Sequence, residues 1–191
     1  MMKEIVGQTS EIYNLKRSIY MGWLMKILAC YDEKNYADTT KVLEKSNVRG
    51  IIIIDGKIAM QRSSVGEYKI PGGGMEEGED YEETLSRELR EEVGLVLIKG
   101  SMRPLGEITE IRKDIFAPDT KYISHSLFFA CEVTEERLPI APTLSEQKKG
   151  YVPAWVTLEE LYETNSRLGK DPWIKRDTAF IKMLMDKEIE Y

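Results

Sequence analysis

The sequence predicts an α+β fold, in which a mixed β-sheet is layered with helices and preceded by an N-terminal helical extension. Short apolar runs rich in β-branched and aromatic residues have strand character, and segments of helical periodicity stand before and between them without strict alternation. With 191 residues and a hydrophobic fraction of 42%, the chain has the size and composition of a globular protein with a substantial core.

Residues 1–46 are predicted to form the helical extension. From Ser10 to Tyr31, apolar residues recur mostly at steps of three or four, which predicts a helix with one wide apolar face. A second short helix is expected from Asp38 to Glu44. The extension is expected to pack on the main domain, to cover a substrate cleft, or to join a second copy of the chain in a homodimer.

Residues 47–191 are predicted to form the main domain. The run 48-VRGIIII-54 and the strand 57-KIAMQR-62 are joined by Asp55-Gly56, a signal for a tight hairpin. Thr157 and Glu160 form a capping-box pattern that begins one helix, and Asp171-Pro172 begins the last. The other strand candidates are residues 95–98, 105–112, 122–133 and 151–156.

Overall charge and cysteine content exclude several classes of protein. The net charge of −6 argues against a general nucleic-acid binder, although metal cations can still bridge the protein to a small phosphorylated ligand. Only Cys30 and Cys131 are present, so we expect no disulfide framework and a reduced, cytoplasmic location. No segment is long enough to cross a bilayer, so no membrane partner is expected.

A glycine-rich loop precedes an acidic helix in 72-GGGMEEGEDYEETLSRELREEVGL-95. Glycines before a helix often hold phosphates, but no Gly-Lys-Ser/Thr follows them, which excludes a P-loop. A helix is predicted from Asp80, a good N-cap, to Val93, with Gly94 as its left-handed stop.

Three glutamates on this helix are placed in an unfavourable way for an isolated protein. Glu88, Glu91 and Glu92 are neighbours on one face, and Glu92 falls on the buried side. Like charges at this spacing are destabilising, and a buried unpaired charge is costly. A divalent cation resolves the conflict, and a set of ligands with oxygen but no sulfur suits Mg²⁺ or Mn²⁺.

These residues resemble the signature of the Nudix hydrolases, G-x5-E-x7-R-E-U-x-E-E-x-G-U, where U is a bulky aliphatic residue. No fixed position of the signature is missing between Gly73 and Leu95, and the flanking strand order from Val48 to Thr157 is also similar. The resemblance implies a Nudix-type α/β/α sandwich for residues 47–191. The matching positions are Gly73, Glu79, Arg87, Glu88, Leu89, Glu91, Glu92, Gly94 and Leu95.

The resemblance implies a MutT-like enzyme that uses Mg²⁺ or Mn²⁺ to hydrolyse the pyrophosphate bond of a small nucleoside diphosphate derivative. It implies that Glu88, Glu91 and Glu92 hold the metal, joined by the carbonyl of Gly72. It also implies that a salt bridge between Glu79 and Arg87 shapes the loop. Metal ions neutralise the charge of the diphosphate and lower the pKa of bound water, which then attacks.

The general base is left open by the resemblance. It is either a box glutamate, Glu91 or Glu92, or a glutamate on a later loop, for which Glu146 is the candidate and an ordinary loop acid is the alternative. Glu107 and Glu110 are weaker candidates.

Substrate identity is also open, because the markers for ADP-ribose and for dinucleoside polyphosphates are absent near Ile111. Arg62, Arg112, Lys113 and Lys121 are expected to be ordinary surface rather than phosphate contacts. Tyr122 and Phe128 are expected in the core rather than against a base, and His125 is expected to be a structural strand residue.

Two other functions are weighed against hydrolysis of a small nucleotide. A non-catalytic nucleotide-sensing module is disfavoured because it has no need for all three inward acids. An RNA 5′-end pyrophosphohydrolase is disfavoured by the acidic balance and by the lack of a basic stripe.

Overall fold

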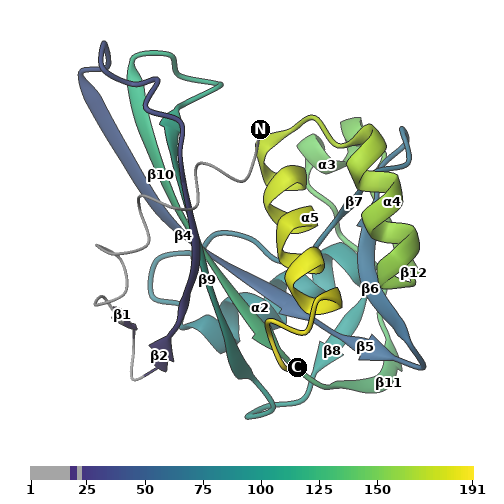
Figure 1. Ribbon diagram of the computed structural model, residues 1–191. Helices are drawn as coiled ribbons and strands as arrows, with labels where there is room; N and C mark the ends of the chain where they lie inside the picture. Colours follow the sequence, from purple (N-terminus) through teal and green to yellow (C-terminus); the bar gives the residue numbers. More distant parts are fainter. Residues whose placement is uncertain (1–17, 21–22) are drawn as a thin grey trace.

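The computed structural model describes residues 18–20 and 23–191, whose helices and strands are drawn in Figure 1. The strands are β1 (Ser18–Tyr20), β2 (Trp23–Met25), β3 (Ile27–Asp32), β4 (Lys41–Ile51), β5 (Ile53–Ile54), β6 (Lys57–Arg62), β7 (Tyr68–Lys69), β8 (Leu95–Leu97), β9 (Arg103–Lys113), β10 (Thr120–Ala130), β11 (Val133–Arg137) and β12 (Val152–Val156). The helices are α2 (Tyr81–Val93), α3 (Leu144–Lys149), α4 (Leu158–Leu168) and α5 (Pro172–Met185).

The central sheet is mixed and has the strand order β3-β9-β10-β4. Strand β10 runs antiparallel to β9 and parallel to β4, and β3 runs parallel to β9. The β10–β4 ladder is long, because it continues from the pair Thr120–Lys41 to the pair Ala130–Ile51. This mixed sheet confirms the predicted α+β class.

A second, antiparallel sheet has the order β12-β6-β5, with β7 paired to β6. Its hairpin is the one predicted at Asp55-Gly56, and both residues have positive φ, 50° and 74°. These values suit a two-residue turn that follows the twist of the two strands. Strands β8 and β11 form a separate antiparallel pair.

Apolar side chains alternate between the two faces of the central sheet and form a core on each side. On one face, Phe128 of β10 stacks on Phe180 of α5, with ring centroids 3.9 Å apart and planes at 8°. On the other face, Phe129 lies in the same cluster as Leu85 and Leu89 of α2. Because successive strand residues point to opposite faces, one strand supplies both cores. Helices α4 and α5 lie on one side of the molecule and α2 on the other (Figure 1).

Helix α2 begins and ends where the sequence predicts. Asp80 and Glu83 form a capping box, and Gly94 ends the helix in the left-handed region with φ of 68°. The predicted helices after Thr157 and Asp171 are also present, as α4 and α5. None of the helices within the described residues is both long and apolar enough to cross a membrane.

The predicted N-terminal helical extension is wrong wherever the structure describes it. Residues 18–20, 23–25 and 27–32 are strands, and the region expected to be the second helix, residues 38–44, enters strand β4 at Lys41. Strand β3 pairs with β9 and strand β4 pairs with β10, partners that lie about 80 residues away along the chain. These remote backbone partners override the local helical spacing. The part of the first expected helix at residues 10–17 and 21–22 lies outside the described residues.

Strands β4 and β10 each have an inner half packed between helices and an outer half that projects beyond them (Figure 1). In β4 the change occurs near Val48: residues 41–45 are exposed, whereas residues 48–51 are buried. One face of the sheet near this transition forms the floor of the cavity described below.

Candidate functional site

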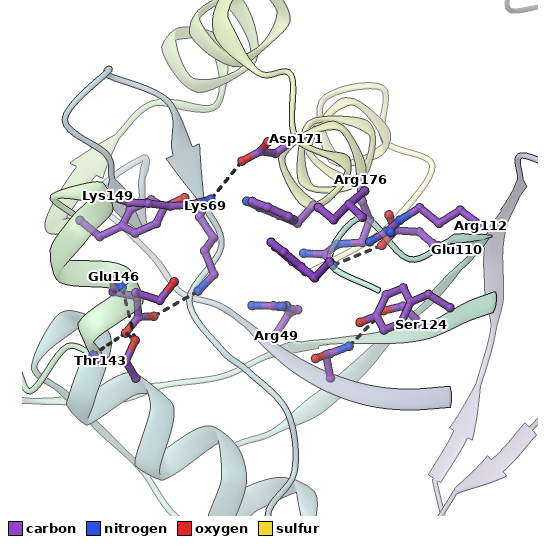
Figure 2. Close-up of a pocket in the computed structure, with 17 residues that line it drawn as sticks. Arg49, Lys69, Glu110, Arg112, Ser124, Thr143, Glu146, Lys149, Asp171 and Arg176 are labelled. Carbon is purple, nitrogen blue, oxygen red and sulfur yellow. Dashed lines mark hydrogen bonds and ion pairs between the residues drawn. The ribbon is translucent and has the colours of Figure 1, made fainter. Parts of the chain in front are cut away.

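A cavity of about 640 Å³ lies over the face of the central sheet that also packs against α5. Figure 2 shows Lys69 and Glu146 on one side of it, Arg112, Glu110 and Ser124 on the other, and Arg49 between them in this view. The lining residues used below are Asn47, Arg49, Lys69, Glu110, Arg112, Tyr122, Ser124, Thr143, Glu146, Lys149, Tyr151, Asp171 and Arg176.

The glycine loop before α2 is fastened to the inner half of β4 by backbone hydrogen bonds. The N–H of Val48 donates to the carbonyl of Gly73 at 2.9 Å, and that of Gly50 donates to Pro71 at 3.0 Å. Gly72 has φ of 128°, and a Cβ there would lie 2.0 Å from the carbonyl oxygen of Val48. Only glycine fits this position, because any side chain would overlap the backbone of β4.

Glu88 lies directly against this loop. A Cβ at Gly73 would be 2.3 Å from Oε1 of Glu88, so the absence of a side chain makes room for the carboxylate. The same oxygen accepts a hydrogen bond from Nη1 of Arg87 at 2.7 Å. Glu88 is therefore held at the loop by one arginine.

Arg87 also holds Glu79 in a bidentate ion pair. Its Nε and Nη2 donate to the two carboxylate oxygens of Glu79 at 2.7 and 2.9 Å, and Nη2 reaches the carbonyl of Gly74 at 3.2 Å. The hydrogen bonds from Arg87 lower the pKa of Glu79 to about 2. This geometry ties the loop to the helix, because one guanidinium contacts both.

Glu92 is the buried carboxylate of the group, with only 4% of the residue exposed. Its Oε2 accepts the N–H of Gly72 at 2.6 Å, and its Oε1 lies 2.6 Å from Nζ of Lys69. Burial raises the pKa of Glu92 to about 7, in spite of the opposing effect of Lys69. The side chain can therefore bind or release a proton near neutral pH.

Glu146 meets Glu92 across Lys69. Its Oε1 lies 3.4 Å from Nζ of Lys69, while its Oε2 accepts hydrogen bonds from the N–H and hydroxyl of Thr143, both at 2.9 Å. Burial alone would raise the pKa of Glu146, but hydrogen bonds with Glu92 and Thr143 outweigh it and lower that pKa to about 2. Glu146 is thus both the third residue of a capping box on α3 and a neighbour of the buried carboxylate.

Glu91 is the most exposed of the three helix glutamates, with 30% of its side chain accessible. Its carboxylate lies 3.6 Å from Arg87 and 3.7 Å from Arg90. The structure brings Glu88 and Glu92 to the glycine loop from the same helix, with Glu91 beside them nearer to solvent.

The groups around the loop have the chemistry to hold a hard dication. They are carboxylates and a carbonyl, which are the ligands that Mg²⁺ and Mn²⁺ prefer, and Gly73 provides the space in which Glu88 lies. Lys69 and Arg87 now partner Glu92 and Glu88, and Arg49 donates to the carbonyl of Gly72. In the described part of the chain, no three acidic, histidine or cysteine side chains are gathered closely enough to hold an ion as they stand. The residues fit such an ion once it replaces these three side chains as the partner of Glu92, Glu88 and the carbonyl of Gly72.

Two basic residues of the site were missed in the sequence. Lys69 stands just before the glycine loop, and Arg49 stands within an apolar run that predicts a strand but no function. For Arg49 the available signal was a charged residue inside a run that is otherwise apolar. The expectation that Arg112 is ordinary surface is wrong, since it is 7% exposed and lines the cavity.

The other candidates lie in different surroundings. Oε1 of Glu107 is hydrogen-bonded to Nδ1 of His125 at 2.6 Å on the opposite face of the sheet. Oε2 of Glu110 lies 3.4 Å from Nη1 of Arg176. Phe128 is a core residue, as expected, while Tyr122 lines the cavity.

Comparison with known proteins gives concordant matches. A family model described as the NUDIX domain matches residues 45–177, which are 133 of the 191 residues. Nucleoside triphosphatase NudI of Escherichia coli K12 is 34% identical over 104 residues, which cover 52% of this chain and 70% of that protein. The same protein of Escherichia fergusonii is 30% identical over 102 residues, with the same coverage.

Solved structures share the fold. The MutT protein of Bacillus halodurans has a TM-score of 0.52 at 21% identity, covering 72% of this chain and 80% of its own. The ORF135 protein of E. coli has a TM-score of 0.51 at 21% identity, covering 76% and 91%.

Proposed function

Since the chain belongs to the NUDIX domain family, we propose that it is a divalent-metal-dependent hydrolase that cleaves the pyrophosphate bond of a nucleoside triphosphate or another nucleoside diphosphate derivative. The NudI relatives are described as nucleoside triphosphatases, which supports the nucleotide part of this assignment. The observation that carries the proposal is the position of Glu92 and Glu146, which share Lys69 beside the glycine loop at one side of a polar cavity.

Mg²⁺ or Mn²⁺ would be held by Glu88, Glu91, Glu92 and the carbonyl of Gly72. When bound, such an ion neutralises phosphate charge and lowers the pKa of a coordinated water. The loop geometry supports this set, because Gly72 and Gly73 let the backbone and Glu88 approach each other closely. The ion pair between Arg87 and Glu79 would hold the loop against helix α2 during the reaction.

Removal of a proton from the attacking water falls to Glu92 or Glu146 in this proposal, with Glu91 as the remaining box glutamate. Glu146 is charged over the whole neutral range, because its pKa is lowered to about 2. Before an ion binds, burial raises the pKa of Glu92 to about 7, so Glu92 holds a proton more strongly than Glu146 does. The two carboxyls come from different elements, α2 and α3, and meet at Lys69 on the same side of the cavity.

Lys69 would release both carboxylates as substrate enters and then face the phosphate oxygens. It lies over the ring of Tyr151 at 5.7 Å from the centroid, inside the cavity lining. A lysine in this position balances the charge of the carboxylates before binding and of the phosphates afterwards.

The test is hydrolysis of a nucleotide panel by the full chain with Mg²⁺ or Mn²⁺, with products identified by mass. The panel contains nucleoside triphosphates, ADP-ribose and dinucleotides. Glu92→Gln is expected to lower kcat about a hundredfold to ten-thousandfold, as loss of a proton-transfer group does. Glu163→Gln on the exposed surface of α4 is the matched control and is expected to leave kcat unchanged. Equal rates with and without EDTA, or an active Glu92→Gln variant, would contradict the proposal.

A further inference from the structure

Two buried arginines of the cavity have no carboxylate within ion-pair distance. Among the five basic side chains in its lining, Lys69, Lys149 and Arg176 each lie within 3.4 Å of a carboxylate: Lys69 with Glu92, Lys149 with Asp171, and Arg176 with Asp177. Arg49 and Arg112 make no ion pair with any described residue, although they are only 6% and 7% exposed. Buried charges in proteins are normally paired, so these two positions are suited to an anion from outside the chain.

The unpaired arginines also have unsatisfied donors. The Nε of Arg49 and the Nε of Arg112 are both buried and without a hydrogen-bond partner in the structure. Arg112 donates from Nη1 to the carbonyl of Lys113 at 3.0 Å, and its guanidinium lies 4.7 Å from the ring centroid of Tyr122. The guanidinium of Arg112 is thus held in one orientation, and its Nε–H has no hydrogen-bond acceptor in the structure.

Glu110 and Asp114 stand two residues on either side of Arg112, but neither forms an ion pair with it. Asp114 accepts the N–H of Phe116 at 2.7 Å, and Glu110 faces Arg176. Oε2 of Glu110 lies 3.4 Å from Nη1 of Arg176, and Nη2 of the same arginine donates to Oδ1 of Asp177 at 2.6 Å. Arg176, Asp177 and Glu110 therefore form one ion-pair network. Arg112 lies outside it.

The two arginines stand at opposite ends of one polar stripe. Arg49 is in register with Phe128 of β10, and Arg112 is in register with Tyr122, six residues away on the same face. Six steps along a strand span roughly 20 Å between backbones, and long side chains can shorten this distance. Arg49 contacts the glycine loop at Gly72, so its end of the stripe is the pyrophosphate end.

Between the arginines the floor carries neutral polar groups. Nδ2 of Asn47 donates to the hydroxyl of Ser124 at 3.1 Å, and both residues line the cavity. An amide and a hydroxyl suit a hydroxyl-bearing unit such as a ribose. The order along the floor is thus Arg49, then Asn47 and Ser124 beside the ion-paired Glu110, then Arg112.

We propose that the cavity binds a nucleoside diphosphate derivative with a second anionic group, remote from the pyrophosphate, which pairs with Arg112. This inference rests on the proposed function only where it assigns the pyrophosphate to the Arg49 end of the cavity. The remote group is a phosphate on a ribose or a carboxylate on the other moiety, and both have oxygens that match a guanidinium. General attraction does not explain such a preference, because the protein carries a net charge of −6.

Binding without turnover tests this subsite independently of catalysis. Affinities of adenosine 5′-monophosphate and of adenosine 2′,5′- and 3′,5′-bisphosphate are compared by calorimetry, without divalent metal. At least one bisphosphate is expected to bind about tenfold or more tightly, as a charge-assisted hydrogen bond allows. Arg112→Gln is expected to bring the ratio close to one, and Arg112→Lys to retain part of it. Arg103→Gln, at the exposed start of the same strand, is the matched control and should keep the wild-type ratio.

Turnover of matched pairs identifies the source of the anion. NADPH against NADH reports a 2′-phosphate, coenzyme A against its dephospho form reports a 3′-phosphate, and UDP-glucuronate against UDP-glucose reports a carboxylate. We expect a higher kcat/KM for the member with the extra anion in at least one pair, and loss of the difference in Arg112→Gln.

The outcomes separate this inference from the proposed function. The anion subsite is overturned if, in the wild type, the extra anion changes neither affinity nor kcat/KM in any pair of ligands. This holds even if the enzyme is active. A preference that persists in a folded Arg112→Gln variant also overturns it. An Arg112-dependent preference in binding, with no hydrolysis of any nucleotide, upholds the subsite and contradicts the proposed hydrolase.

Discussion

The inner and outer halves of strands β4 and β10 show how one pair of strands can serve two purposes. The inner half, residues 48–51 and 127–130, is buried between α2 on one face and α5 on the other. The outer half keeps the same parallel ladder, yet Val42 and Leu43 are 66% and 36% exposed. Backbone pairing is therefore continuous while side-chain burial is not. Stability is concentrated in the inner half, and the buried polar floor of the cavity begins there at Arg49 and continues toward the outer half.

The largest effect expected from this comparison is on the inner half. Phe128→Ala removes the ring that stacks on Phe180 and should lower the free energy of unfolding by about 3–5 kcal/mol. Leu43→Ala, on the outer half of β4, should cost less than about 1 kcal/mol because the side chain is already partly in water. Denaturant unfolding of both variants measures the difference. Similar losses for the two variants would show that the halves are equally important for stability.

The next effect concerns the loop that rests on the inner half. Gly72→Ala forces a Cβ into the carbonyl of Val48 and should lower stability by about 2–4 kcal/mol, since it combines steric overlap with a positive φ. Gly56→Ala is the matched control, because Gly56 has φ of 74° but nothing near its missing Cβ. It should cost only about 1 kcal/mol. If thermal unfolding gives equal losses, the loop is not clamped against β4.

The inner half is also the part of the fold that could be predicted from the sequence. The run at residues 48–54 is apolar and β-branched, and a capping residue and a glycine mark the ends of α2, so local signals and tertiary packing agree there. The inward position of Glu92 followed from the same helical periodicity, and it is 4% exposed.

The outer half and strand β3 could not be predicted, because their hydrogen-bond partners are remote in sequence. Residues 27–32 have apolar spacing that fits a helix, but the edge of β9 supplies backbone partners for a strand. For a related reason Arg49 was missed and Arg112 was wrongly expected at the surface. The burial of Arg112 depends on packing around α5 and β10 that no local pattern shows.

A smaller effect tests whether charge, in addition to packing, holds the glycine loop. Glu79→Gln breaks the bidentate pair with Arg87 and should lower stability at pH 7 by about 1 kcal/mol. The hydrogen bonds from Arg87 lower the folded-state pKa of Glu79 to about 2, below its unfolded value of about 4.3. This stabilisation is therefore present above about pH 4.3 and is lost as the pH falls toward 2.

Unfolding curves of wild type and Glu79→Gln at pH 7 and pH 3 measure this loss. The two proteins should differ clearly at pH 7 and less at pH 3. Glu77→Gln, an exposed acid in the same loop, is the control and should match wild type at both pH values. A constant difference across this range would mean that the effect of Glu79→Gln is not electrostatic.

The smallest expected effect lies on the outer half, at the face of the sheet opposite the cavity. Nδ1 and Nε2 of His125 lie 2.6 Å from Glu107 and 2.9 Å from Glu44, and Thr109 also donates to Glu107 at 2.8 Å. The hydrogen bond with Glu107, opposed by burial and assisted by Glu44, raises the pKa of His125. A group with a raised folded-state pKa stabilises the fold below its unfolded pKa of about 6.5, and this contribution is lost as the pH rises through the folded value.

His125→Gln should therefore destabilise the protein by up to about 1 kcal/mol at pH 6 and by less at pH 9. His125 is the only histidine in the chain, so its ring protons give one resolved NMR titration whose midpoint reads the folded pKa directly. Glu44→Gln should lower that midpoint, because it removes one of the two carboxylates that favour the charged ring. A midpoint at or below 6.5, or a variant that loses more stability at pH 9 than at pH 6, would show that the outer half has no such charge pairing. The two halves of these strands would then differ in burial alone.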